Sequence, residues 1–315
     1  METIKALIER FDQWQQRHRA PAVVWAVNKK YGDDRGGYLA ALIAYYGFIS
    51  IFPLMLAAFS IAAFVLGGHV NALSSIYKHL ANFPVLGPSV AALEKGHLSG
   101  SILAVVIGLL GLVWGATGLA KTMQHVNDEA WNVPGRERIG FPDTIIVSLE
   151  WFAVFGLGVV LSFGLSSFGA AIHWGAIGPI VSNVVAFAVD LGFYLVSFKL
   201  FTHKEATWRQ LLPGAVLGSL SWTVLTGVGI GLLQHDVSHA SALYGTFGTT
   251  IGLIGFVYLI ARISIYGVEL NVVLDRHLWP RTVTSPPLST ADRQQLIDLA
   301  RREERSKDET VRVEF

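Results

Sequence analysis

Two ionisable side chains stand near the middle of long apolar runs. Asp190 lies within residues 177–201 and Arg262 within residues 248–274. A charge at the centre of a bilayer costs roughly 2.5–3.5 kcal/mol on insertion scales, so it normally faces protein or water. If both runs cross a membrane in the same direction, the two charges lie at similar depth, and we expect them to pair or to share a polar cavity. They would form either a structural ion pair that sets helix register or a substrate or proton site, and the sequence leaves both open.

Further polar side chains recur around these charges at helical spacing. Residues four and seven apart share one face of a helix. Tyr194 follows Asp190 by four residues, and Tyr266 follows Arg262 by four. The set predicts a polar column that runs from the midplane toward the cytoplasm and lines an inward-open cavity. The candidate pathway residues are Asp190, Arg262, Glu269, Glu150, Asn183, Tyr194, Tyr258 and Tyr266.

Glu269 has a second interpretation. With Asn271 it would form a polar pair at the cytoplasmic end of its helix. Side chains in such positions extend toward the interface and keep their polar ends in water. The residues alone do not separate this end-of-helix pair from a pathway site.

A membrane domain is needed to hold these side chains. The chain is 52% hydrophobic and 15% charged, whereas soluble domains carry about 25% charged residues. Because about 20 apolar residues suffice to cross a bilayer, we predict an all-α polytopic membrane protein with six transmembrane helices, an N-terminal amphipathic helix and a C-terminal cytoplasmic tail. Pro53 falls inside the first span and should act as its hinge. The predicted spans are 38–66, 99–121, 144–165, 177–201, 210–233 and 248–274.

Glycine pairs at four-residue spacing recur within and beside these spans. Such pairs let two helix backbones approach closely, so we expect tight helix packing where they occur. The pairs are Gly111/Gly115, Gly214/Gly218, Gly227/Gly231 and Gly248/Gly252.

Two polar segments, 1–37 and 276–315, flank the membrane domain 38–275. Residues 2–19 are amphipathic, and this helix would either lie in the cytoplasmic headgroup layer or pack on the ends of the bundle. Its apolar face comprises Ile4, Leu7, Ile8, Phe11 and Trp14. We also expect a turn-rich hinge at 28–37, a polar loop at 122–143, an outer loop at 234–245 and a soluble helix at 290–305.

The basic residues orient the chain. In a six-span topology, all of the 24 lysines and arginines except Lys78, Lys95 and Arg262 fall on the side that holds both termini. Basic residues near span ends stay in the cytoplasm. We therefore predict a multi-pass protein with cytoplasmic N and C termini.

Signatures of soluble enzymes are missing. The chain has no cysteine, which excludes disulfides and thiolate sites, and it has no P-loop, no GxSxG and no carboxylate cluster beside a basic RNA-binding surface. We predict no enzyme activity, no cofactor and no nucleic-acid partner. His235 and His239 could hold Zn²⁺ on a helix, but no HExxH motif accompanies them, so no metal site is predicted. Whether the loop with His235, Asp236 and His239 binds anything stays open.

Three stretches together resemble one family. They are AALIAYYGFISIFPLM (40–55), WGATGLAKTMQHVNDEAWNV (114–133) and YGVELN (266–271). Their order and spacing are similar to the YihY / virulence factor BrkB family of bacterial inner-membrane proteins, over roughly residues 20–275. The resemblance implies the bacterial inner membrane, an envelope role and export of lipid or lipopolysaccharide. The family was once labelled ribonuclease BN, and the residues give that label no support.

Two functions follow as hypotheses. The first is a transporter of a lipid or another envelope amphiphile, through an inward-open polar cavity at Asp190 and Arg262. The second is a non-transporting scaffold for envelope assembly that recruits partners through its tail and loops; deleting residues 280–315 should then abolish function. Membrane lipids are the expected partners, and envelope-protein partners and a homo-oligomer remain open.

Overall fold

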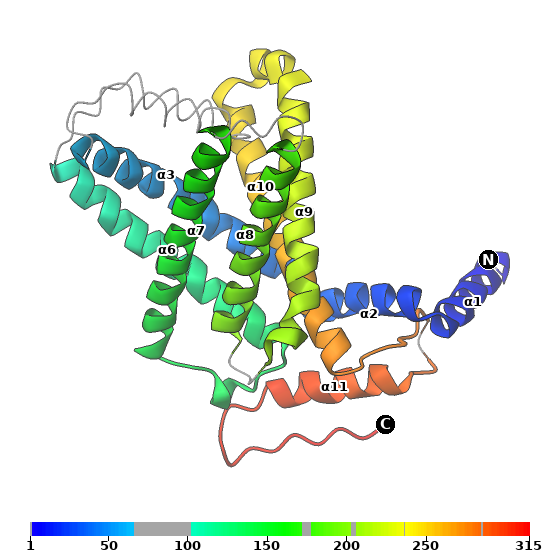
Figure 1. Cartoon of the computed structure of the whole chain (residues 1–315). Helices are drawn as coiled ribbons and strands as arrows, with labels where there is room; N and C mark the ends of the chain where they lie inside the picture. Colours follow the sequence, from blue (N-terminus) through cyan, green and yellow to red (C-terminus); the bar gives the residue numbers. More distant parts are fainter. Residues whose placement is uncertain (1, 66–101, 172–177, 203–205, 236, 285) are drawn as a thin grey trace. The chain divides into compact units, whose positions relative to one another are not determined.

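In the computed structural model of the protein, the regular secondary structure of the described residues is helical (Figure 1). The all-α prediction is therefore confirmed for that part of the chain. The structure describes all residues except 1, 66–101, 172–177, 203–205, 236 and 285. The elements are α1 (Glu2–Arg17), α2 (Arg19–Asp33), α3 (Gly36–Val65), α6 (Ile102–Ala130), the 3₁₀ turn η1 (Gly135–Glu137), α7 (Asp143–Ala171), α8 (Gly178–Phe201), α9 (Trp208–His235), α10 (Val237–Asp275) and α11 (Thr290–Arg302).

Two of the described helices are long and apolar enough to cross a membrane. The stretches are Val181–Phe201 in α8 and Thr250–Asp275 in α10, and both fall in predicted spans. The stretch Gly36–Ile51 in α3 is apolar but shorter. The six-span count, the hinge at Pro53 and the cytoplasmic placement of both termini stay predictions.

The chain divides into two compact units, and several helices contribute to both. The candidate residues Asp190, Arg262 and Glu269 all belong to unit 1. Unit 1 comprises Met1–Leu39, Met123–Ser219 and Arg262–Phe315, and unit 2 comprises Ala40–Thr122 and Leu220–Ala261.

Within unit 2, α3 and α6 pack through glycines. A Cβ built on Gly115 would lie 2.5 Å from the Ser50 hydroxyl oxygen, and one on Gly111 would lie 3.0 Å from the Pro53 ring. The later glycine of α6 thus lies beside the earlier residue of α3, and the earlier glycine beside the later residue. The two helices therefore run antiparallel. The predicted close approach at Gly111 and Gly115 is confirmed.

Within unit 1, α9 and α10 approach backbone to backbone. A Cβ on Gly214 would collide with the carbonyl oxygen of Gly267, and one on Gly218 would lie 2.7 Å from the Tyr194 ring. The pair Gly214/Gly218 therefore also marks a close approach, as predicted. Gly227, Gly231 and Gly248 lie where only the helical backbone is described.

Three segments expected to be loops or hinges are partly helical. The hinge predicted at 28–37 is wrong up to Asp33, where α2 ends, and the loop predicted at 122–143 is wrong up to Ala130, where α6 ends. The outer loop predicted at 234–245 is also wrong, because α9 extends to His235 and α10 begins at Val237; Asp236 lies outside the described residues. Turn-forming residues and polar composition were the basis of these predictions. In the first two segments, polar residues stay helical because several of them are buried and bonded, as Gln124 is to the Thr144 carbonyl.

Candidate functional site

A fully buried lysine on α2 joins three helices of unit 1. The Lys30 ammonium forms ion pairs with Asp34 and with Glu269, whose Oε2 lies 2.9 Å away, and it donates to the Ala130 carbonyl at 2.7 Å. The ammonium therefore donates hydrogen bonds to Asp34 and to the Ala130 carbonyl and has Glu269 as a second anionic neighbour. Burial alone would lower the pKa of Lys30, but the charges of Glu269 and Asp34 outweigh it and the pKa is raised. The lysine thus ties α2 to α10 and to the end of α6.

The charge cluster continues from α2 into the tail. Arg302 of α11 donates to Asp34 Oδ1 at 2.9 Å and lies 3.0 Å from Glu129 Oε2. Arg138 in turn lies 2.8 Å from Glu129 Oε1. Each acidic group in this series lies beside a basic group, and such pairing offsets the cost of removing charges from water. We call Lys30, Asp34, Glu129, Arg138, Glu269 and Arg302 the charge cluster.

A second carboxylate anchors the start of α11. Asp292 accepts hydrogen bonds from Lys29 at 2.9 Å and from Arg281 at 2.8 Å. It also completes a capping box with Ser289, which satisfies backbone N–H groups at the helix start. Burial raises the pKa of Asp292, but hydrogen bonds from Lys29, Thr282 and Arg281 outweigh it and hold the pKa well below its usual range. The tail is therefore part of the fold of unit 1, with α11 alongside α2 (Figure 1).

Arg262 lies against two tyrosines. Its guanidinium carbon is 5.7 Å from the centre of the Tyr31 ring and 5.8 Å from that of Tyr266. The two rings are stacked with centroids 4.3 Å apart, and the Tyr266 hydroxyl donates to Asn28 Oδ1 at 3.1 Å. These distances fit cation–π contacts, while the arginine side chain is exposed. We call Arg262, Tyr31 and Tyr266 the arginine–tyrosine site.

Asp190 and Arg262 do not form the expected ion pair in the part of the chain that the structure describes. Tyr194, one turn after Asp190, is buried and shares a hydrogen bond of 3.4 Å with Ser264 of α10. Ser264 and Arg262 are two residues apart, about 200° around the helix. Asp190 therefore belongs to the face where α8 meets α10, whereas Arg262 faces α2.

Glu269 is buried and does not extend its side chain to water. Its side chain has no solvent exposure, and Asn271 is equally enclosed, accepting a hydrogen bond of 2.7 Å from the Gly214 amide. The end-of-helix interpretation is therefore wrong. Glu269 Oε1 has no hydrogen-bond partner among the described residues.

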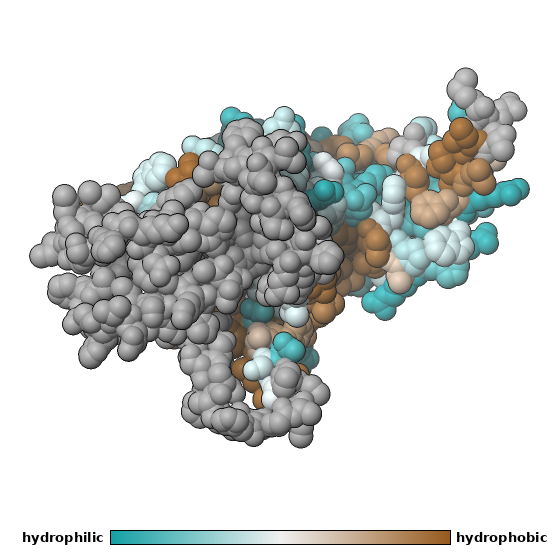
Figure 2. All heavy atoms as spheres, turned by 90° about the horizontal axis from the view of Figure 1, so that it is seen from above, coloured by the Kyte–Doolittle hydropathy of each residue, from teal (hydrophilic) through white to brown (hydrophobic). Residues whose placement is uncertain are grey.

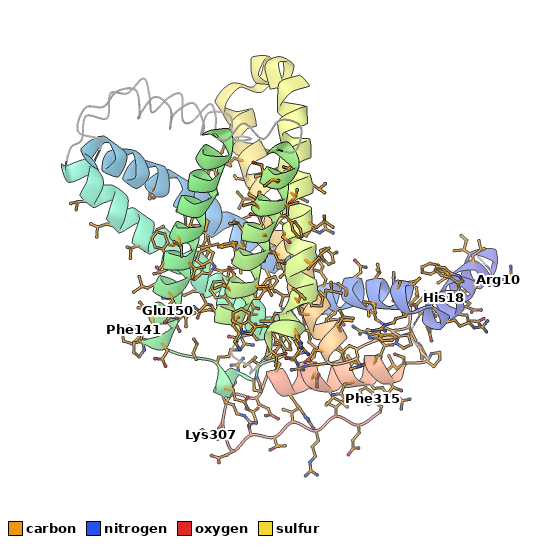
Figure 3. All side chains as sticks on the ribbon, viewed as in Figure 1. Arg10, His18, Phe141, Glu150, Lys307 and Phe315 are labelled. Carbon is orange, nitrogen blue, oxygen red and sulfur yellow. The ribbon has the colours of Figure 1, made fainter. Side chains whose placement is uncertain are left out.

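The remaining candidates are not brought together. Glu150 on α7 (Figure 3) and Asn183 on α8 are exposed, and Tyr258 on α10 is partly buried. None of the three makes a hydrogen bond or ion pair with the described residues. Their role in a pathway stays a prediction.

Histidines 235 and 239 lie at the end of α9 and in α10, in a stretch of which only the backbone is described. Asp236 lies outside the described residues. Among the described residues, no three His, Asp or Glu side chains cluster as metal ligands would.

Sequence reasoning missed Lys30, Asp34, Glu129 and Arg302. They lie in segments expected to be a hinge, a loop and a tail, where charge normally means exposure. One signal was available, because Lys30 and Asp34 have the spacing of an i, i+4 pair on a helix. Their partners in α6, α10 and α11 are distant in sequence, and no local pattern points to them.

In the part of the chain that the structure describes, the regular elements are helices and two of them are long and apolar enough to span a bilayer, which is consistent with a membrane protein. The model of the virulence factor BrkB family matches residues 27–290, and the chain belongs to this family of membrane proteins. This confirms the resemblance found in the sequence.

Individual relatives are distant. The chain is 24% identical over 294 residues to inner membrane protein YhjD of Escherichia coli K12, covering 84% of this chain and 83% of YhjD. It is 24% identical over 268 residues to YfkH of Bacillus subtilis, whose name calls it ribonuclease-like, covering 78% and 93% of the two chains. UPF0761 membrane protein Smlt0865 of Stenotrophomonas maltophilia is 22% identical over 286 residues, which is 84% of this chain and 64% of that protein. No solved structure matches the chain.

Proposed function

We propose that the protein is an inner-membrane transporter of a lipid or another envelope amphiphile with an anionic head group, and that the arginine–tyrosine site binds that head group. The observation that carries the proposal is the position of Arg262. It lies midway along the candidate span Thr250–Asp275, its side chain is exposed, and its guanidinium lies over two stacked tyrosine rings. The similarity to a protein named for the inner membrane supports the location.

The chemistry of the site favours an anionic amphiphile. A guanidinium is always charged and donates in a planar fork that matches phosphate and carboxylate. Its exposure leaves it accessible from the surface of the helix, where an acyl chain would meet the apolar side chains Leu259 and Ile263. A bound anion would offset the cost of a charge in an apolar environment. Asp190, half-buried on α8, would be a second polar position on the route.

The test uses the full chain in proteoliposomes that contain fluorescent phosphatidylglycerol, with dithionite reduction as the measure of transbilayer movement. We expect Arg262→Ala to slow movement about tenfold, as a loss of ~1.4 kcal/mol in head-group binding predicts, and Arg262→Lys to slow it less. Asp190→Asn should slow it severalfold. Arg209→Ala, which removes an exposed arginine at the start of α9, is the matched control. Wild-type rates in folded Arg262→Ala would rule out the site, and no movement with the wild type would rule out this lipid class.

The scaffold hypothesis needs a different test from the one that the sequence indicated. The segment 280–315 contains Arg281, Asp292 and Arg302, whose ion pairs hold unit 1 together. Its deletion would therefore disturb folding under either hypothesis. Deletion of residues 306–315, most of which are exposed, separates them. A scaffold that recruits partners through its tail would lose function, whereas a transporter would keep its rate.

A further inference from the structure

The amphipathic helix α1 is held by its polar flank. Gln15, with no solvent exposure, donates to the Arg281 carbonyl at 2.7 Å, and Asp12 accepts from the Val283 amide at 3.1 Å. A side-chain hydrogen bond of 3.0 Å from Gln15 to Asp12 links the two. These contacts fix the rotation of α1 about its own axis relative to the tail.

This rotation leaves most of the apolar face of α1 exposed, although Phe11 makes an edge contact with Trp25 of α2. Leu7 is 60% exposed and Trp14 50% exposed, although the free energy of such side chains is lower when they are out of water. Figure 2 shows hydrophobic residues at the surface of α1 next to hydrophilic ones. The uncovered face comprises Ile4, Leu7, Ile8, Phe11 and Trp14.

The fold places this helix beside a membrane-crossing element. Only His18 separates α1 from α2, and α2 is bound to α10 by the ion pair of Lys30 with Glu269. Glu269 lies six residues before the end of the candidate span at Asp275, which is about 9 Å along a helix. The level of α2 is therefore that of the span's end, where lipid head groups lie.

The charged side chains of α1 indicate what kind of surface its apolar face contacts. Lys5, Arg10 and Arg17 are exposed along its sides, with Arg10 labelled in Figure 3. A helix with an apolar face, an aromatic residue on that face and basic flanks is typical of binding in the plane of an anionic bilayer surface. Trp14 is such an aromatic residue, suited to the boundary between head groups and acyl chains.

We propose that α1 lies in the headgroup layer of the membrane in which the protein resides, with its apolar face inserted among lipids and its basic flanks on anionic head groups. This rests on the membrane location of the chain and not on transport. The sequence left two positions open for this helix, in the headgroup layer or packed on the ends of the bundle, and the proposal takes the first. The polar contacts through Asp12 and Gln15 fix which side of the helix meets the lipid.

Because the chain has no cysteine, single cysteines report on each side of α1. The full chain is labelled with an environment-sensitive fluorophore at Leu7→Cys and Trp14→Cys, with Glu9→Cys, an exposed position on the opposite side, as the matched control. In proteoliposomes with phosphatidylglycerol, we expect the first two labels to be quenched severalfold more by doxyl-labelled lipid than the third, and severalfold less by iodide.

Two results would overturn the proposal. One is equal iodide access at Leu7 and Glu9. The other is a Leu7 label protected from iodide but insensitive to doxyl lipid, with disulfide cross-linking between copies at that cysteine, which would mean that a second copy of the chain covers the face. Vesicles without anionic lipid should show reduced lipid quenching at Leu7. Transport rates do not enter this measurement, so failure here leaves the proposed function standing.

Discussion

The charge cluster and the arginine–tyrosine site lie within unit 1 and share helices α2 and α10. Their central charged side chains differ in exposure to solvent. Lys30 is enclosed, and its ammonium lies against two carboxylates and a carbonyl oxygen. Arg262 is exposed and lies over aromatic rings. A buried charge that is fully paired serves the fold, because breaking the pair leaves an uncompensated ion. The exposed Arg262 is the charge to which the proposed function assigns a ligand. The difference shows that the position of a charged residue in the sequence pattern does not predict whether its side chain is enclosed, because enclosure depends on the helices that pack around it.

The largest expected effect comes from breaking the cluster at its centre. Lys30→Met would leave Glu269 buried without a counter-charge and would leave Asp34 with Arg302 as its one remaining basic neighbour in the cluster, which costs about 3–5 kcal/mol. We expect a marked loss of folded protein and of thermal stability in detergent. Lys121→Met, at an exposed lysine of α6, is the control. Adding Glu269→Gln to Lys30→Met should restore part of the stability, and no change with Lys30→Met would show that the cluster is not what joins α2 to α10.

A second substitution tests the backbone contact beside the cluster. Gly214→Ala would drive a methyl group into the Gly267 carbonyl, and we expect a loss of about 1–3 kcal/mol from overpacking. Gly192→Ala, where nothing lies within 4 Å of the added carbon, should be neutral or slightly stabilising. Thermal unfolding of both variants measures the difference, and equal melting temperatures would contradict the close approach of α9 and α10.

The pH dependence of stability reports on the tail. Because the pKa of Asp292 is lowered in the folded state from about 3.9 in an unfolded chain, its contribution to stability is present above about pH 4 and is lost as pH falls toward the folded value. Asp292→Asn should therefore cost about 1–3 kcal/mol at pH 7. The gap in melting temperature between wild type and variant should close as pH falls below 4. A gap that stays constant with pH would mean that the charge of Asp292 does not hold the tail.

The smallest expected change in stability is at the arginine–tyrosine site. Arg262→Ala removes cation–π contacts at an exposed position, worth about 0.5–1 kcal/mol. Thermal unfolding should show this small change in the same preparation whose lipid movement is slowed. A destabilisation as large as that of Lys30→Met would assign Arg262 to the fold and remove the contrast between the two regions.

Local pattern was sufficient for much of this protein. Hydropathy and helical periodicity identified helices at α3, α7, α8 and α9, the amphipathic α1 and the start of α11 at Thr290. The glycine spacing identified the close approaches at Gly111, Gly115 and Gly214. Three short stretches identified the family. Each of these features depends on residues within a few turns of one helix or on the order of motifs along the chain.

The tertiary structure decided which side chains contact one another. The ion pair between Lys30 and Glu269 joins residues at opposite ends of the chain, and the side of α10 that Arg262 occupies depends on which helices pack beside it. Two charges at matching depth in neighbouring apolar runs were expected to meet. They do not meet among the described residues. The position of a residue along a helix fixes its depth, whereas the side of the helix on which it lies determines its neighbours only once the other helices have packed.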